Sequence, residues 1–172
     1  NPLGVNMDRP RSIKAFFATN AAVARTWNGT GSWFDEATWS PPGMPGRQDP
    51  VTVRAGTVTL PAPITVASTT LSNRATLNFR NWFAELRAGD VTIDGTVTHD
   101  PESDTNGAVG VYGDWTPDAR VHIVCWNLRL TTNGIINVDY KGYRGSQQAD
   151  HAGPGCGPGG GTGPTTRGGG GG

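Results

Sequence analysis

The stretch VTVRAGTVTL at residues 51–60 decides the fold class, because Val and Leu alternate there with Thr and Arg around a single glycine. A period of two places apolar side chains on one face of a strand and polar ones on the other. Runs of three or four residues with this character recur along the chain, each closed by Gly, Asn, Asp or Pro. They occupy residues 51–53, 57–60, 64–66, 76–79, 91–93, 96–98, 121–124, 128–130 and 135–138. The pattern predicts an all-β chain with many turns.

Strands this short suit the coils of a β-solenoid, in which each turn of chain contributes two or three strands and stacks on its neighbour. Leu60, Leu77 and Ile93 are separated by 17 and 16 positions, which suggests equivalent places in successive coils. A short-strand β-solenoid of the parallel β-helix type is therefore the predicted architecture. A β-sandwich or jelly roll is the alternative, because the repeat is imperfect.

The composition narrows the class of function. Fourteen Lys+Arg and 14 Asp+Glu give a formal net charge of zero, which argues against a nucleic-acid binder that neutralises phosphates. Charged residues are only 16% of the 172 residues, whereas glycine occurs 26 times and proline 13 times, as expected of a turn-rich β-protein. No apolar run reaches the length of about 18 residues that a membrane-spanning helix requires, so no membrane span is predicted.

Composition also divides the chain. An N-terminal arm (1–24) precedes a β-solenoid domain (25–140) with a Trp-rich cap (25–50), and a Gly/Pro-rich irregular tail (141–172) follows. The arm is weakly basic, then apolar, and ends in Ala-Val-Ala, so a remnant of a secretory signal peptide is one interpretation of it. A mature arm is the preferred interpretation. The five glycines that end the tail suggest a native chain that continues past Gly172.

The start of the domain resembles the opening coil of secreted bacterial parallel β-helix proteins, both autotransporter-passenger-like proteins and surface proteins with a C-terminal sorting tag. It reads TWNGTGSW at 26–33, ATWS at 37–40, PG at 45–46 and AGTVTL at 55–60. GDVTIDGTV at 89–97 resembles a later coil, and residues 128–143 with the following glycines resemble a coil with a glycine-rich insertion. The resemblance covers residues 26–172 and implies a right-handed parallel β-helix in an extracellular or cell-surface protein. It implies no single activity, since such solenoids serve as adhesins, stalks, filaments and polysaccharide-processing enzymes.

Three tryptophans, Trp27, Trp33 and Trp39, recur every six residues. The preferred interpretation is a cluster of large side chains that caps the open end of the first coil. The alternative is a sugar-stacking platform, because an indole face suits the apolar face of a pyranose ring. The remaining tryptophans are expected in the core or in a subunit contact; they are Trp82, Trp115 and Trp126.

The acidic stretch 100–107 approximates the start of a calcium-binding loop, with oxygen ligands at the alternate positions Glu102, Asp104 and Asn106. Glu replaces the leading Asp of such a loop, and Gly113 stands where a bidentate Glu is required. The stretch is therefore interpreted as a solvated acidic turn, and no metal or other cofactor is predicted.

The two cysteines, Cys125 and Cys156, lie 31 positions apart. An even number in a chain that resembles secreted proteins permits one disulfide, which would tie the tail to the last regular strand. One buried and one mobile thiol is the alternative. Asn28 opens the only N-x-S/T triplet, which makes it a candidate glycosylation site if the chain is a glycoprotein.

Motifs for catalysis are not evident. The sequence has no nucleophile elbow, zinc-binding H-E-x-x-H or phosphate-binding loop. Asp90, Asp94, His99 and Asp100 come nearest to a catalytic group, because paired carboxylates serve in hydrolases. Nothing in their local sequence distinguishes them, and the chain is predicted not to be an enzyme.

The predicted function is that of a secreted structural or surface protein, a self-assembling subunit of an extracellular fibre or adhesive stalk. The arm carries Ile13, Phe16, Phe17 and Val23, too few apolar residues for a core, and is expected to dock on another subunit as an added strand. Head-to-tail contacts that do not close produce filaments. The predicted partner is therefore a second copy of the chain, with surface or extracellular glycans as further partners. The alternative function is a polysaccharide-binding module, or a polysaccharide lyase or hydrolase, on the same scaffold.

Overall fold

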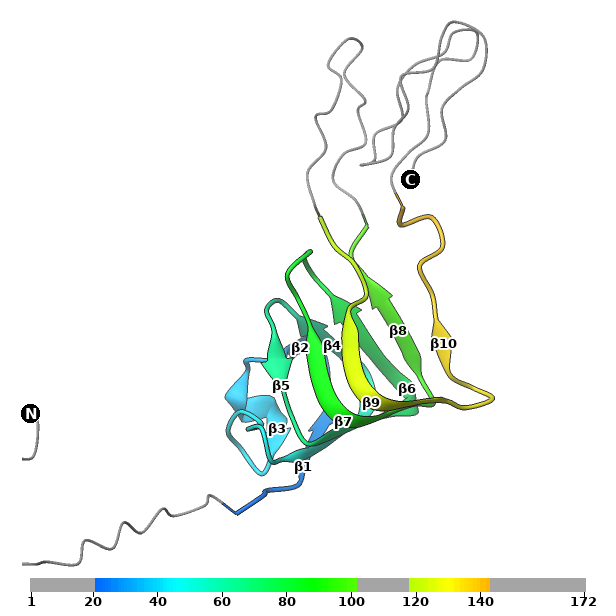
Figure 1. Cartoon of the computed structure of the whole chain (residues 1–172). Helices are drawn as coiled ribbons and strands as arrows, with labels where there is room; N and C mark the ends of the chain where they lie inside the picture. The colour runs from blue at the N-terminus through cyan, green and yellow to red at the C-terminus, as the bar shows by residue number, and fades with distance from the viewer. Residues whose placement is uncertain (1–20, 102–117, 143–172) are drawn as a thin grey trace, which may run out of the picture.

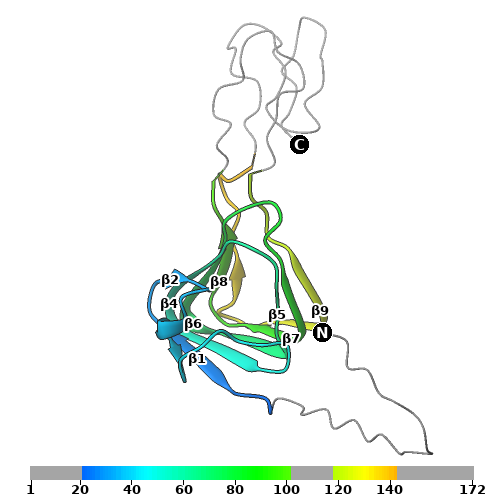
Figure 2. The same ribbon diagram turned by 90° about the vertical axis from the view of Figure 1, so that its left-hand side faces the viewer.

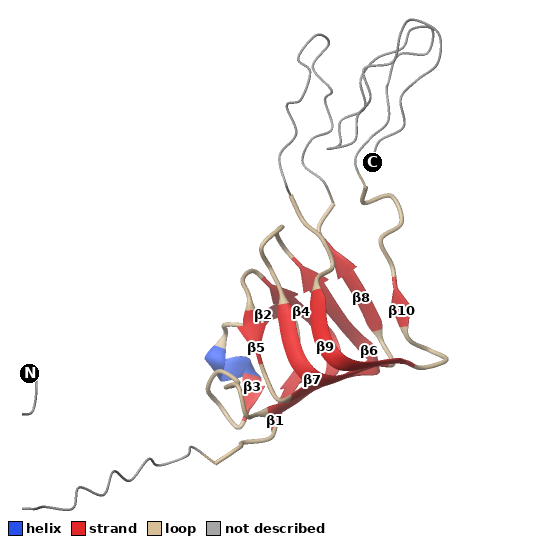
Figure 3. Ribbon diagram, in the orientation of Figure 1, coloured by secondary structure: helices blue, strands red, loops and turns tan. Residues whose placement is uncertain are grey.

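The computed structural model describes residues 21–101 and 118–142, and these residues are built almost entirely of strands (Figures 1 and 3). The strands are β1 (Arg25–Asn28), β2 (Gly31–Ser32), β3 (Trp39–Ser40), β4 (Pro50–Leu60), β5 (Ile64–Thr65), β6 (Ser68–Phe79), β7 (Leu86–Ile93), β8 (Thr96–His99), β9 (Ile123–Leu130) and β10 (Ile135–Ile136). The helical part of the described chain is one 3-10 turn, η1 (Glu36–Thr38). The all-β class predicted from the sequence is confirmed.

Parallel pairing arranges the strands in three columns, which stand as three walls around a common interior (Figure 2). The first column aligns β1, β4, β6, β7 and β9 through Arg25, Val51, Thr69, Val91 and Leu128. The second aligns β4, β6, β8 and β10 through Val58, Leu77, Val97 and Ile136. The third aligns β5, β7 and β9 through Ile64, Leu86 and Ile123. The antiparallel pair of β3 with β1 lies at one end of this arrangement.

The observed register corrects the repeat expected from the sequence. Leu77 is aligned with Val58 and Val97, so aligned positions of neighbouring strands are 19 and 20 residues apart here. Leu60 is aligned with Phe79, and Ile93 with Leu71. The spacing of 17 and 16 positions between Leu60, Leu77 and Ile93 therefore connects non-equivalent positions. The misleading spacing arose because every second residue of a strand is apolar, so a shift of two or four positions looks the same in sequence.

Four strands, β4, β6, β7 and β9, are longer than the predicted runs of three or four residues, and β6 reaches 12 residues. Long strands arise because β4 and β6 continue around a corner, each taking part in two columns. In β4 the corner is marked by a register shift between Val53 and Ala55 and by Gly56, whose φ is +78°. A local bulge of this kind bends a strand and interrupts its ladder of hydrogen bonds only locally, so pairing resumes on both sides of it.

The core follows the predicted alternation. In β4 Val51, Val53, Val58 and Leu60 are fully buried, whereas the intervening residues are partly or wholly exposed. Equivalent positions of β6, β7 and β8 are filled by Leu71, Leu77, Phe79, Leu86, Val91, Ile93 and Val97. The interior between the walls is thus a single apolar stack, to which a long strand such as β4 contributes four inward side chains, two in each of its two columns.

Candidate functional site

The last strands leave their inward-facing side chains half exposed. Leu128 and Leu130 of β9 are 51% exposed and Ile136 of β10 is 42% exposed. Their partners one strand earlier in the columns are Val91, Ile93 and Val97, which are at most 2% exposed. The side chains have the same orientation in both layers. The difference arises because Val91, Ile93 and Val97 are covered by the next layer, and no further described layer covers Leu128, Leu130 and Ile136.

The backbone is also open at this place. Among the described residues β9 pairs only with β7, and β10 pairs only with β8. The other edge of each strand therefore presents N–H and C=O groups that no described strand uses. An uncovered edge is a template for pairing with another strand. We call Leu128, Leu130 and Ile136, together with the outer edges of β9 and β10, the open end.

The opposite end is closed by tryptophan. Trp27, Trp33 and Trp39 are at most 1% exposed, and their rings meet edge to face, with centroids 5.0 and 4.8 Å apart. The indole N–H of Trp27 donates to the Gly29 carbonyl, and that of Trp39 to the Trp33 carbonyl, each over 2.9 Å. Burial with a satisfied N–H is the usual state of a core tryptophan. The sugar-stacking interpretation of these residues is wrong, because no ring face is left for a sugar.

Val23, predicted to dock on another subunit as part of the arm, is instead held on its own chain at this closed end. The Val23 N–H donates to Asp49 Oδ1 over 2.8 Å, and the Gly46 N–H donates to Asp49 Oδ2 over 2.8 Å. Arg25 Nε donates to the same Asp49 Oδ2 over 3.1 Å. Burial by itself would raise the pKa of Asp49, but the hydrogen bonds from Gly46, Val23 and Arg25 outweigh it and lower the pKa. Val23 thus marks a fixed point from which residues 1–22 depart.

Several predicted site residues lie outside the described residues. These are Ile13, Phe16 and Phe17 of the arm, the calcium candidates Glu102, Asp104 and Asn106, and Cys156 of the suggested disulfide. Cys125 lies on β9, partly buried against the core, and its pairing with Cys156 stays a prediction. Asn28 is exposed at the end of β1, a position that a glycan can reach.

The acidic residues considered for catalysis hold neighbouring strands together. Asp90 Oδ1 accepts from Asn127 Nδ2 over 2.7 Å, and Asp94 accepts from Thr131 and Asn133. Asp100 accepts from Asn78, and the buried His99 contacts the Asp100 carbonyl through Nδ1. Each carboxylate therefore has a structural partner on the adjacent layer or loop.

Within residues 21–101 and 118–142, no group of three or more His, Cys, Asp or Glu side chains is placed to hold a metal ion. No helix in the same residues has the length and apolar character needed to cross a membrane.

The open end was missed by sequence reasoning. Leu128, Leu130 and Ile136 carry the same alternation as the buried residues of earlier strands, so nothing local marks them as exposed. Trp126, expected in the core or a subunit contact, is 92% exposed, so its placement in the core is wrong. The signal that identifies these positions is their place in the last layer, which only the register reveals.

Comparison of the chain with protein families, curated proteins and solved structures finds no match in any of the three.

Proposed function

We propose that the three walls are those of a β-solenoid of the parallel β-helix type, and that the chain is a self-assembling structural subunit of an extracellular fibre or adhesive stalk. The observation that carries this proposal is the contrast between the closed end and the open end. The resemblance of residues 26–172 to secreted β-helix proteins supports the extracellular location.

The solenoid part of the proposal is supported by the aligned columns. Val58, Leu77, Val97 and Ile136 succeed one another at the same place in successive layers, and each step passes through the other walls before it returns. A stack of this kind buries its apolar side chains only against adjacent layers. Its last layer therefore stays incomplete until something adds to it.

Covering the apolar side chains of the open end is favourable in free energy. Full burial of an aliphatic side chain contributes about 1.5–3 kcal/mol, so covering the exposed half of Leu128, Leu130 and Ile136 contributes about 2–4 kcal/mol in total. Association costs at least about 4 kcal/mol in lost freedom of motion. Apolar contact alone is therefore insufficient, and the occupant must also pair with the edges of β9 and β10.

The proposed occupant is the N-terminal segment of a second copy, residues 1–20. Residues 143–172 of the chain contain no Val, Ile, Leu, Met, Phe or Trp, and Tyr143 is their one large aromatic residue. Residues 1–20 bring Ile13, Phe16 and Phe17. Because Val23 is held at the closed end, the segment departs from the end opposite to the one it covers. Such a contact is head-to-tail and propagates instead of closing a dimer.

The test uses two defective chains that complement each other. One lacks residues 1–20, which keeps the bond from Val23 to Asp49, and the other carries Leu128→Asp and Leu130→Asp. In electron micrographs and sedimentation velocity the intact chain should form polymers of uniform width. Each defective chain should stay monomeric with an unchanged circular dichroism spectrum.

A mixture of the two defective chains should form heterodimers and nothing larger, since only one arm and one open end remain. Phe83→Asp is the matched control, because Phe83 is exposed outside the open end and its loss should leave polymers intact. An intact chain that stays monomeric at high concentration contradicts self-assembly. Polymers formed by the chain without residues 1–20 contradict the role of the arm.

A further inference from the structure

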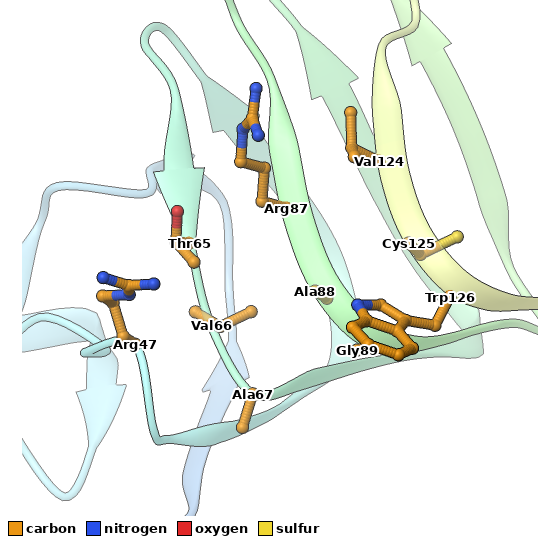
Figure 4. Close-up of a pocket in the computed structure, with 10 residues that line it drawn as sticks. All are labelled: Arg47, Thr65, Val66, Ala67, Arg87, Ala88, Gly89, Val124, Cys125 and Trp126. Atoms are coloured by element: carbon orange, nitrogen blue, oxygen red, sulfur yellow. The ribbon is translucent and has the colours of Figure 1, made fainter.

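A groove of about 410 Å³ lies on the wall formed by β5, β7 and β9 (Figure 4). It is not lined by the buried tryptophans Trp27, Trp33 and Trp39, nor by Leu128, Leu130 and Ile136 of the open end. Its polar lining comes from Arg47, Thr65 and Arg87, and Trp126 stands beside it. In Figure 4 Arg47 and Trp126 lie on opposite sides of a floor that contains Ala67 and Gly89. Neither the sequence analysis nor the proposed self-assembly assigns a role to this groove.

The register explains why the wall is hollow here. Ala88 is aligned with Cys125 and Asp90 with Asn127, which places Gly89 beside Trp126. The Gly89 N–H donates to the Ala67 carbonyl over 2.8 Å, so this alanine is the next neighbour in the same row. The row therefore consists of Trp126, which is large, followed by Gly89 and Ala67, which have almost no side chain. The indole of Trp126, 92% exposed, consequently borders open space and not other side chains.

The charge of the groove is positive. Two arginines and no Asp or Glu line it. Arg87 forms an ion pair with the buried Glu85. Its Nε donates to Glu85 Oε1, and its Nη2 donates to Glu85 Oε2 over 3.2 Å. Arg47 is exposed and has no ion pair or side-chain hydrogen bond within the described part of the chain. The guanidinium of Arg47 is thus available to an anion, and its planar fork matches a carboxylate.

We propose that this groove binds an acidic saccharide, with a uronate carboxylate on Arg47 and the apolar face of a sugar ring on Trp126. A ring that rests on the indole lies over the small residues of the floor, where a bulky side chain would exclude it. The hydroxyl of Thr65 can exchange hydrogen bonds with the sugar hydroxyls. A saccharide is favoured over an acidic peptide, because an exposed, flat aromatic face next to a flat floor fits a ring better than an irregular chain.

The probes for the test are trisaccharides of galacturonate, of mannuronate and of the glucuronate-containing repeat of hyaluronan, with neutral maltotriose and tetraglutamate as comparisons. Binding to the intact chain is measured by isothermal titration calorimetry. At least one uronate trisaccharide should bind, more weakly as salt rises, and at least tenfold more tightly than either comparison. Trp126→Ala and Arg47→Gln should each weaken that binding about tenfold.

Arg54→Gln and Phe83→Ala are the matched controls, because both side chains are exposed elsewhere and should leave binding unchanged. Arg47 and Trp126 are preferred to Arg87 as targets, since loss of Arg87 would leave the buried Glu85 without its arginine. Circular dichroism verifies that the variants stay folded. The proposal is overturned if no uronate trisaccharide binds, if maltotriose or tetraglutamate binds equally well, or if Trp126→Ala leaves the affinity unchanged.

Discussion

Asp49 connects the start of the described chain to the rest of the molecule. One carboxylate accepts hydrogen bonds from Val23 and Arg25 at the start of the described chain and from Gly46 in the loop before β4. Arg25 also donates to the Pro41 and Pro42 carbonyls, over 2.8 and 2.9 Å. A single buried carboxylate thereby fixes both the entry of β1 and the loop before β4.

The first prediction concerns this carboxylate. Asp49→Asn should destabilise the fold at neutral pH by about 1–3 kcal/mol, since it removes the charge that Arg25 and the two N–H groups stabilise. The folded pKa of Asp49 is lowered, so its contribution is present above the unfolded value of about 3.9 and is lost as pH falls through the folded pKa. Thermal unfolding should therefore differ between the two chains at neutral pH and converge in strong acid.

Asp139→Asn is the control for Asp49→Asn, because Asp139 is exposed and lies near the opposite end of the described chain. This variant should unfold like the unmodified chain at neutral pH. A difference between Asp49→Asn and the unmodified chain that is as large in strong acid as at neutral pH would show that packing, and not charge, is responsible.

At the scale of the elements, glycines at Gly56 and Gly134 allow neighbouring layers to pack closely. A Cβ added at Gly56 would lie 1.9 Å from the Gly29 carbonyl oxygen, and one at Gly134 would lie 2.1 Å from that of Ile93. Gly56 also has a φ of +78°, in the region that L side chains rarely adopt. The corner of β4 therefore requires glycine for two independent reasons, the conformation and the space.

The second prediction follows from this corner. Gly56→Ala should lower the free energy of unfolding by at least about 2 kcal/mol, because left-handed backbone costs an L residue about 1–2 kcal/mol before any clash. Gly142→Ala is the matched control, since a Cβ at Gly142 meets nothing within 4 Å. Its effect should stay within about 0.5 kcal/mol. Urea unfolding measures both, and equal midpoints for the two variants would contradict this account of the corner.

Several segments of strand were not predicted from the sequence, among them β1, β2, β3, the first half of β6 and the start of β7. The first half of β6 contains Thr69, which is buried at the position aligned with Val51 and Val91. Its hydroxyl has no hydrogen-bond partner in the described part of the chain. A threonine at a position that is aliphatic in the neighbouring strands interrupts the apolar alternation of the sequence, although its β-branched shape fits the layer. The start of β7, Leu86–Ala88, was also not predicted. It contains only two apolar residues, one on each side of Arg87, which is too short a run to indicate a strand.

For the molecule as a whole, the two ends of the stack differ in kind. One is closed by three indoles and an antiparallel strand, and the other presents uncovered side chains and strand edges. A stack with unlike ends has a direction, which suits head-to-tail addition of copies.

The third prediction uses this asymmetry. If copies cover each other's open ends, the midpoint of thermal unfolding should rise with protein concentration, because binding to the folded state stabilises it. A tenfold increase corresponds to at most about 1.4 kcal/mol, or a rise of a few degrees for a chain of this size. The chain without residues 1–20 should show no such rise in calorimetry. An equal rise in both chains would mean that association does not use the arm.

The sequence by itself determined the class of structure and the orientation of most side chains. Alternation in residues 51–60 correctly separates the buried Val51, Val53, Val58 and Leu60 from their neighbours. This is possible because the two faces of a strand are set by local backbone geometry, whatever the strand packs against. The high content of glycine and proline likewise accounts for the frequent turns.

Only the tertiary structure decided the register, the burial of Trp27, Trp33 and Trp39, and the existence of an open end. Leu128 and Val91 have the same local pattern, yet one is half exposed and the other is buried. The groove beside Trp126 depends in the same way on Gly89 and Ala67, which are distant in sequence. Local sequence determines the face toward which a side chain points, whereas its burial depends on the layer that lies next to it, and long-range contacts alone supply that layer.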